Sequence, residues 1–131
     1  MYGPCFSTAN GNELWVIILE KAWAKLHGDY VRIIGGLSHE TFRDITGAPS
    51  YMYQTSNEGD IWEILSSADK RGYMMACGVS GETQQEVDEL AENGLINGHA
   101  YSLINCASVI GSDGREADIV QVRNPWGSFE W

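Results

Sequence analysis

Residues 99–124, HAYSLINCASVIGSDGREADIVQVRN, decide the fold. Residues 99–111 are largely apolar and residues 117–124 carry Ile and Val, so both runs predict β-strands. Asp113 and Gly114, which lie between the runs, form a pair favoured in tight hairpin turns. The strands are therefore predicted to be antiparallel, with His99 and Asn124 close together where the hairpin opens.

A histidine at a strand end is either a packed core residue or half of a catalytic pair, and the residue alone does not decide. Gly98 removes a side chain where an extended backbone could approach, and Asn124 could hold one ring nitrogen of His99 while the other faces a cleft. An asparagine orients the ring and suits a histidine paired with a thiolate, whereas an aspartate would suit a serine nucleophile. Trp126 could shield the hydrogen bond between Asn124 and His99 from water, or fill the core.

The clearest helix is predicted at the N-terminal end of the chain, where apolar residues recur at three-and-four spacing. Asn12 is the expected cap of this helix and Gly28 its expected end. The apolar stripe consists of Trp15, Ile18, Leu19, Ala22, Trp23 and Leu26.

Two further helices and one more strand are predicted before the hairpin. Gly35 and Gly36 form a candidate hinge, followed by a short helix capped by Ser38 and ending near Gly47. Residues 57–72 predict a second amphipathic helix, and residues 73–79 a short strand. The acidic residues 80–98 predict an exposed loop with some helix, with a solvated surface as the simpler interpretation.

The composition bounds the class of protein. The 131 residues allow one modest core, and the net charge of −10 disfavours nucleic acid as a partner. No segment resembles a signal peptide or a membrane span, and the odd number of cysteines argues against a disulfide framework. We therefore expect a cytoplasmic α+β protein, with helices preceding an antiparallel sheet or barrel.

The three cysteines show no metal-ligand spacing, and none is an obvious nucleophile. Cys77 and Cys106 lie in apolar strand-like runs, where a free cysteine behaves as a small hydrophobe. Cys5 precedes the first predicted helix and is interpreted as structural. The sequence therefore offers a histidine and an asparagine suited to thiol chemistry without a cysteine to match them.

Four motifs, in order along nearly the whole chain, resemble the calpain-type cysteine proteases. They are ELWVIILEKAWAKLHGDY before the two glycines, ITGAP, NGHAYSL and VRNPWGSFEW. The resemblance implies a partial papain-like fold, in which residues 1–34 are the last strand and helix of a first protease lobe. Residues 35–131 would then be most of the second, strand-rich lobe.

The resemblance also implies roles for individual residues. His99 matches the family's catalytic histidine, Asn124 its orienting asparagine and Trp126 the neighbouring tryptophan, while Gly98 belongs to the histidine motif. The family's nucleophile lies in a glycine-aspartate-cysteine-tryptophan motif that is expected upstream of this chain, in the missing first lobe. The substrates would be proteins. Calcium is the implied cofactor, and Glu130 matches a position that contributes to a calcium site in the second lobe.

Two alternatives remain open. The chain could be a catalytically inactive calpain-like module that binds calcium or a protein partner, which the −10 charge and the absent cysteine motif would favour. It could also be a self-contained enzyme that pairs Cys5 with His99. In each case the apolar stripe of the first helix, including Trp15 and Trp23, predicts self-association of the isolated chain.

Overall fold

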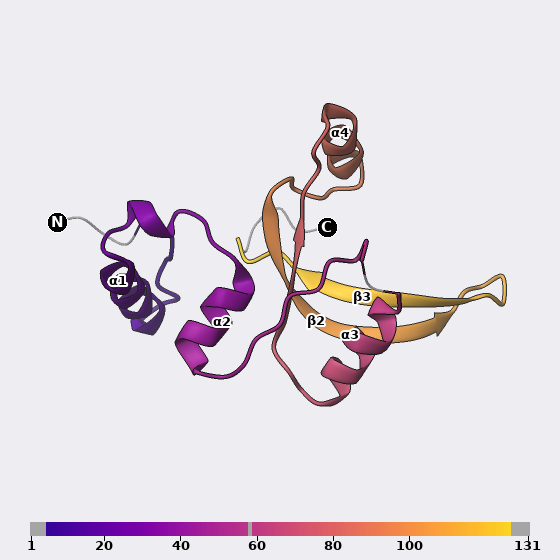
Figure 1. The fold of residues 1–131 in the computed structure, drawn as a ribbon, viewed down its shortest axis with the longest axis horizontal. Coiled ribbons are helices and arrows are strands. Elements are labelled where there is room, and N and C mark those ends of the chain that lie inside the picture. The colour runs from indigo at the N-terminus through magenta and orange to yellow at the C-terminus, as the bar shows by residue number, and fades with distance from the viewer. Residues whose placement is uncertain (1–4, 58, 127–131) are drawn as a thin grey trace.

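The computed structural model describes residues 5–57 and 59–126, which form an α+β arrangement as predicted. Helices α1 and α2 lie on one side of the molecule, and a sheet with α3 and α4 lies on the other (Figure 1). None of the described helices is long and apolar enough to cross a bilayer. The elements are α1 (Trp15–His27), the 3-10 turn η1 (Val31–Ile33), α2 (Ser38–Thr46), α3 (Ile61–Lys70), β1 (Met75–Val79), α4 (Gln84–Glu92), β2 (His99–Ile110) and β3 (Glu116–Arg123).

Helix α1 covers the predicted stripe, but its expected cap was wrong. The residue before the helix is Leu14, whose side chain makes no capping hydrogen bond. Asn12 instead lies within a tight turn in which the Glu13 amide donates to the Asn10 carbonyl at 3.1 Å. This turn separates Asn12 from the first helical residues, whereas Gly28 follows the helix with a positive φ as predicted.

The starts of α2 and α3 also correct the sequence analysis. Ser38 is already helical, and the extended residue before it is Leu37, so the Ser38 hydroxyl cannot act as the cap. Helix α3 starts at Ile61 rather than near residue 57, because the Asp60 carboxylate accepts a hydrogen bond from the Glu63 amide at 3.0 Å.

The sheet has the order β1-β2-β3, with both pairs antiparallel, so the predicted hairpin is confirmed. Strands β2 and β3 form a long ribbon whose turn extends away from the rest of the molecule (Figure 1). In this turn the Gly111 amide donates to the Arg115 carbonyl at 2.8 Å, and Gly114 has a φ of 78° that suits glycine. Strand β1 pairs only with the first part of β2, from His99 to Leu103.

One irregularity interrupts the hairpin in the middle of β2. Leu103 pairs with Val122 and Asn105 pairs with Gln121, which leaves Ile104 as an extra residue without a partner. A β-bulge of this kind shifts the register by one residue and changes which side chains share a face. No feature of the sequence predicted it.

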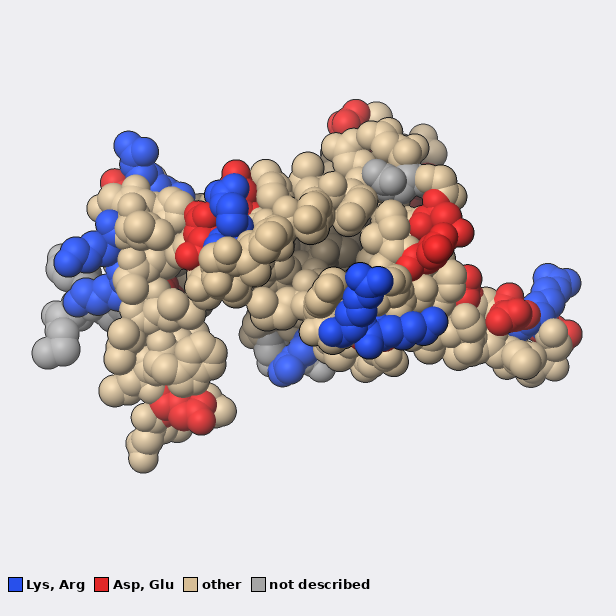
Figure 2. Space-filling model, turned by 60° about the horizontal axis from the view of Figure 1, so that its bottom comes forward, with Lys and Arg blue, Asp and Glu red and all other residues tan. Residues whose placement is uncertain are grey.

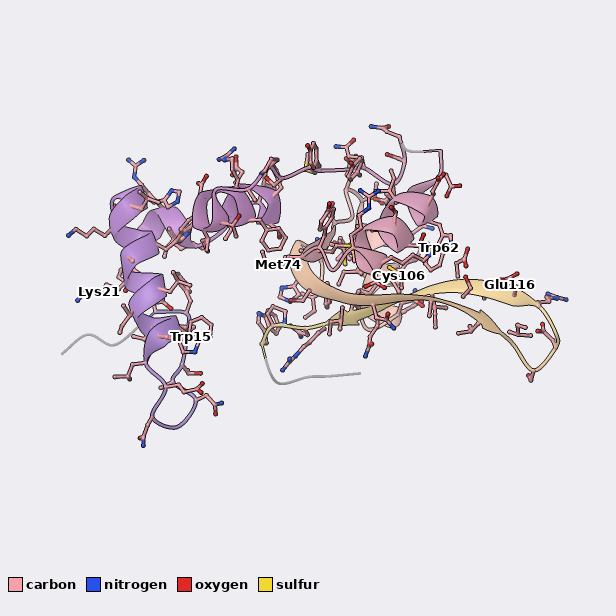
Figure 3. The ribbon with its side chains drawn as sticks, turned by 90° about the horizontal axis from the view of Figure 1, so that it is seen from below. Trp15, Lys21, Trp62, Met74, Cys106 and Glu116 are labelled. Carbon is pink, nitrogen blue, oxygen red and sulfur yellow. The ribbon has the colours of Figure 1, made fainter. Side chains whose placement is uncertain are left out.

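The described core is small. The buried apolar residues among those described are Ala24, Tyr101 and Leu103. Trp62 of α3 and Cys106 of β2 lie between that helix and the strand (Figure 3), and the Cys106 amide donates to the Asp69 carboxylate at 3.2 Å. Uncharged surface dominates the face shown in Figure 2, with charged side chains in small separate groups.

Candidate active site

The structure brings His99 and Asn124 together. His99 is the first residue of β2, Asn124 directly follows β3, and the His99 Nε2 atom lies 2.9 Å from the Asn124 Oδ1 atom. Both residues are half-buried. The predicted proximity of the two side chains is therefore confirmed.

The bulge at Ile104 explains why the two side chains share a face. Near the turn, Ile110 pairs with Glu116, and that register, continued without a bulge, would place Asn124 opposite Ser102. In the observed register Ser102 pairs with Arg123, so Asn124 follows opposite Tyr101. Opposite residues of antiparallel strands point to the same face, and so do alternate residues of one strand. Asn124 therefore joins the face that carries Tyr101 and His99.

The hydrogen bonds of Asn124 define the proton arrangement of the histidine. The Trp126 amide donates to Asn124 Oδ1 at 3.1 Å, so this oxygen acts as an acceptor. His99 Nε2 therefore carries the proton and donates to the same oxygen, which leaves a lone pair on Nδ1. Among residues 5–57 and 59–126, no group forms a hydrogen bond with Nδ1. Nδ1 is also absent from the buried atoms that lack a partner, so it is accessible. The ring is thus prepared to accept a proton at Nδ1.

Two aromatic rings contact the imidazole. Trp126, 55% exposed, lies with its ring centre 4.6 Å from that of His99, and the two planes are tilted by 57°. Tyr101, only 6% exposed, approaches His99 at 4.8 Å with an interplanar angle of 88°. The sequence analysis missed Tyr101, although the alternation of a strand places residues 99 and 101 on one face.

Gly98 has a different role from the one expected. A Cβ built at this position would have no atom within 4 Å, so no close approach of backbone requires a glycine. Instead Gly98 has a φ of 67°, and its amide donates to the Val79 carbonyl at 2.9 Å. Glycine is favoured here because of this left-handed conformation directly before His99.

The described thiols do not match a nucleophile for His99. Cys77 lies opposite Tyr101, but burial raises the pKa of its thiol, whereas a nucleophile needs a lowered pKa. Burial and then the nearby Asp69 carboxylate raise the pKa of the Cys106 thiol. Cys5 is bound through its amide to the Glu20 carboxylate of α1 at 2.8 Å, and α1 lies on the other side of the molecule from the sheet (Figure 1). The geometry therefore does not support a pairing of Cys5 with His99.

Metal binding receives no support from the described part of the chain. No group of three or more His, Cys, Asp or Glu side chains among these residues could hold a metal ion. Glu130, the residue matched to a calcium site, lies outside the described residues. Calcium binding therefore stays a prediction from the sequence.

An open cavity of about 410 Å³ lies between the segment around Gly35 and Gly36 and the sheet. On the sheet side it is lined by Ala76, Ala100, Tyr101, Ser102 and Pro125. Ala100 and Ser102 alternate with the residues of the histidine face, and His99 does not line the cavity. Through Tyr101 and Pro125 the cavity nevertheless adjoins the candidate active site.

Comparison with known proteins finds similarity along most of the chain. The family described as calpain family cysteine protease matches residues 2–131. The chain is 34% identical to the calpain-1 catalytic subunit of Rattus norvegicus and 38% identical to calpain-9 of Homo sapiens, each over 125 residues. It is 36% identical over 122 residues to calpain-8 of Rattus norvegicus. These alignments cover 95%, 95% and 92% of this chain but 17%, 18% and 17% of the relatives. The chain thus spans less than a fifth of the length of these curated relatives.

Proposed function

Because this chain belongs to the calpain family of cysteine proteases, we propose that it is part of an endopeptidase that hydrolyses internal peptide bonds of proteins. In this enzyme His99 is the catalytic base and Asn124 orients it. The observation that carries the proposal is the 2.9 Å contact between His99 Nε2 and Asn124 Oδ1. That contact leaves Nδ1 as the ring atom that can exchange a proton with a thiol.

The nucleophile in this proposal comes from a segment N-terminal to the chain. Residues 1–34 are then the end of the first protease lobe, and residues 35–131 are most of the second. Two observations support this division. The described thiols are unsuited to the role, and α1 exposes apolar residues such as Trp15 and Ile18 that a further lobe could cover.

The proposed chemistry follows from the free nitrogen of the ring. His99 Nδ1 takes the proton of the thiol, and the resulting imidazolium forms an ion pair with the thiolate. The thiolate attacks the peptide carbonyl, and the imidazolium then gives its proton to the leaving amine. Asn124 Oδ1 keeps accepting from Nε2–H throughout, so the ring stays in one orientation. Trp126 covers one side of this hydrogen bond, which strengthens it by excluding water.

Replacing His99 tests the proposal. In the longer protease, His99→Ala should lower kcat for peptide cleavage by about 10²- to 10⁴-fold, because general acid-base catalysis is lost. The measurement is cleavage of a fluorogenic peptide, with circular dichroism to show that the fold is retained. His27→Ala, at the exposed last residue of α1, is the matched control and should cleave normally. Full cleavage by His99→Ala would refute the assignment.

A second candidate function is a module without catalysis that binds a protein partner or calcium. The lack of a suitable thiol among the described residues favours it as well. Sequencing of the transcript upstream of Met1 separates the two candidates. A glycine-aspartate-cysteine-tryptophan motif there supports the protease, whereas a true start codon without that motif supports the module.

A further inference from the structure

We propose that Tyr101 is a positioning residue for His99, an inference that rests on the proposed protease function. Tyr101 contacts the imidazole on one side while Trp126 contacts it as well, with ring centres 4.8 and 4.6 Å away. The two contacts differ in rigidity, since Trp126 is 55% exposed and Tyr101 only 6% exposed. Of the two aromatic side chains that contact the imidazole, Tyr101 is therefore the more rigidly held.

A hydrogen bond fixes the far end of the Tyr101 side chain. Its hydroxyl oxygen accepts from the Ile96 amide at 3.0 Å, in the loop that leads from α4 into β2. The same loop is held at two other points. The Gly81 amide donates to the Asn97 side chain at 2.8 Å, and the Gly98 amide donates to the Val79 carbonyl at 2.9 Å. Tyr101 is thus tied to a fixed segment of backbone.

The contacts of Tyr101 restrict the motion that matters for catalysis. Rotation of the imidazole by a half-turn about its bond to Cβ would put Cδ2 in the place of Nδ1 and Cε1 in the place of Nε2, and would break the bond to Asn124. The perpendicular approach of the Tyr101 ring, at 88°, places an aromatic wall in the path of this rotation. Tyr101 does not touch a reacting atom in this scheme. It acts through His99 by keeping Nδ1 directed toward the thiol.

Two substitutions separate the ring of Tyr101 from its hydroxyl group. In the longer protease, Tyr101→Leu removes the aromatic wall and should lower kcat by about ten- to a hundredfold, with KM nearly unchanged, because His99 is misplaced. Tyr101→Phe keeps the wall but leaves the Ile96 amide without its acceptor, and should lower kcat by about two- to tenfold. Tyr51→Phe is the matched control, since Tyr51 is 74% exposed, and should leave kcat unchanged.

Rates are expressed per active site, titrated with an irreversible thiol-directed inhibitor, so that loss of folded protein does not count as loss of kcat. A second readout is the ¹H–¹⁵N correlation spectrum of the His99 ring, in which the Nε2–H signal held by Asn124 should be sharp in the wild type and weakened or broadened in Tyr101→Leu. An unchanged kcat or an unchanged ring spectrum in folded Tyr101→Leu overturns the inference. If that variant does not fold, Tyr101→Phe decides by the same two readouts. Failure of the protease proposal itself would appear separately, as cleavage by His99→Ala.

Discussion

Asn124 connects two parts of the candidate active site through one carboxamide oxygen. That oxygen accepts from the His99 ring at 2.9 Å and from the Trp126 amide at 3.1 Å. The bond from the Trp126 amide establishes the direction of the bond from His99, because it shows that the oxygen of the Asn124 carboxamide, rather than its nitrogen, faces the ring. A side chain chosen from the sequence as a partner for His99 therefore also determines which ring nitrogen stays free.

Gly98 supports this site through its backbone, and its substitution gives a prediction at the scale of one residue. Its φ of 67° should make Gly98→Ala lower the free energy of unfolding by about 1 to 2 kcal/mol, since a Cβ disfavours left-handed backbone. Gly98→Asn should cost less, because asparagine tolerates that region. Urea unfolding followed by tryptophan fluorescence measures both. Gly36→Ala is the control, since a Cβ there meets no atom within 4 Å and φ is not left-handed. Equal losses in Gly98→Ala and Gly36→Ala would contradict the argument.

At the scale of elements, α4 begins with a capping box that depends on pH. The Glu86 carboxylate accepts from the Thr83 and Glu82 amides at 2.9 and 2.8 Å, and the Thr83 side chain accepts from the Glu86 amide. The hydrogen bond from the Thr83 backbone, followed by that from Glu82, lowers the pKa of Glu86 below its ordinary value of 4.5. A lowered pKa in the folded state means that the capping contribution is complete above pH 4.5 and is lost as the pH falls through the folded pKa.

The measurement is the NMR chemical shift of the Thr83 and Glu82 amides as the pH is lowered. We expect both amides to titrate together, with a midpoint below 4.5. In Glu86→Gln the side chain keeps an acceptor oxygen but carries no titrating group, so this step should disappear. A midpoint above 4.5, or the same step in Glu86→Gln, would be inconsistent with the capping box as its cause.

The hairpin gives a second prediction at this scale. The pairing between β2 and β3 differs by one residue on the two sides of the bulge at Ile104. Deletion of Ile104 removes the extra residue and leaves Leu103 opposite Val122 and Asn105 opposite Gln121. We therefore expect this deletion to keep Asn124 on the face of His99. Deletion of Gln121 should separate the two side chains. Asn124 would lie opposite Ser102, on the other face, if the bulge is kept, or opposite Leu103, on the same face as His99 but further along β2, if the bulge is lost.

Cross-strand nuclear Overhauser effects and the Nε2–H signal of His99 report the two outcomes. The signal should persist after deletion of Ile104 and vanish after deletion of Gln121. The two deletions serve as controls for each other, since both shorten a paired strand by one residue. Loss of the signal in a folded chain lacking Ile104 would show that the bulge does more than adjust the register.

At the scale of the whole molecule, the chain exposes more surface than a compact protein of its length. Its accessible surface is 10605 Å², compared with about 6900 Å² expected for a compact monomer of 131 residues. Exposed apolar side chains contribute to this surface, and at α1 they are Leu14, directly before the helix, and Trp15, Ile18 and Leu26, which are 57 to 68% exposed. Such a surface favours association with other apolar surfaces.

We therefore expect the isolated chain to self-associate, as its sequence predicted. Sedimentation velocity over a range of concentrations should show an average mass that rises with concentration. Ile18→Glu places a charge on the exposed apolar face of α1 and should weaken this association. Lys21→Glu adds the same charged side chain at an exposed polar position of the same helix (Figure 3) and should weaken it less. A monomer at every concentration would contradict the prediction.

The sequence by itself determined the features that depend on neighbouring residues. The three-and-four spacing of α1, the Asp113 and Gly114 turn and the apolar runs of β2 and β3 are local patterns, and the corresponding elements were predicted correctly. The family also followed from motifs in the sequence. The helix starts were less certain: capping depends on backbone angles at one residue, so Asn12 and Ser38 were wrong although the helices themselves were right.

Only the tertiary structure decided how these elements form a site. The bulge at Ile104 selects the face of Asn124, and this choice depends on pairing between strands rather than on the residues beside it. The aromatic contact from Tyr101 and the amide of Trp126 likewise become visible only when the chain has folded around His99. A one-residue change of register reverses a face without altering the strand pattern. For that reason the sequence could predict that His99 and Asn124 would be close, but not the interactions that orient them.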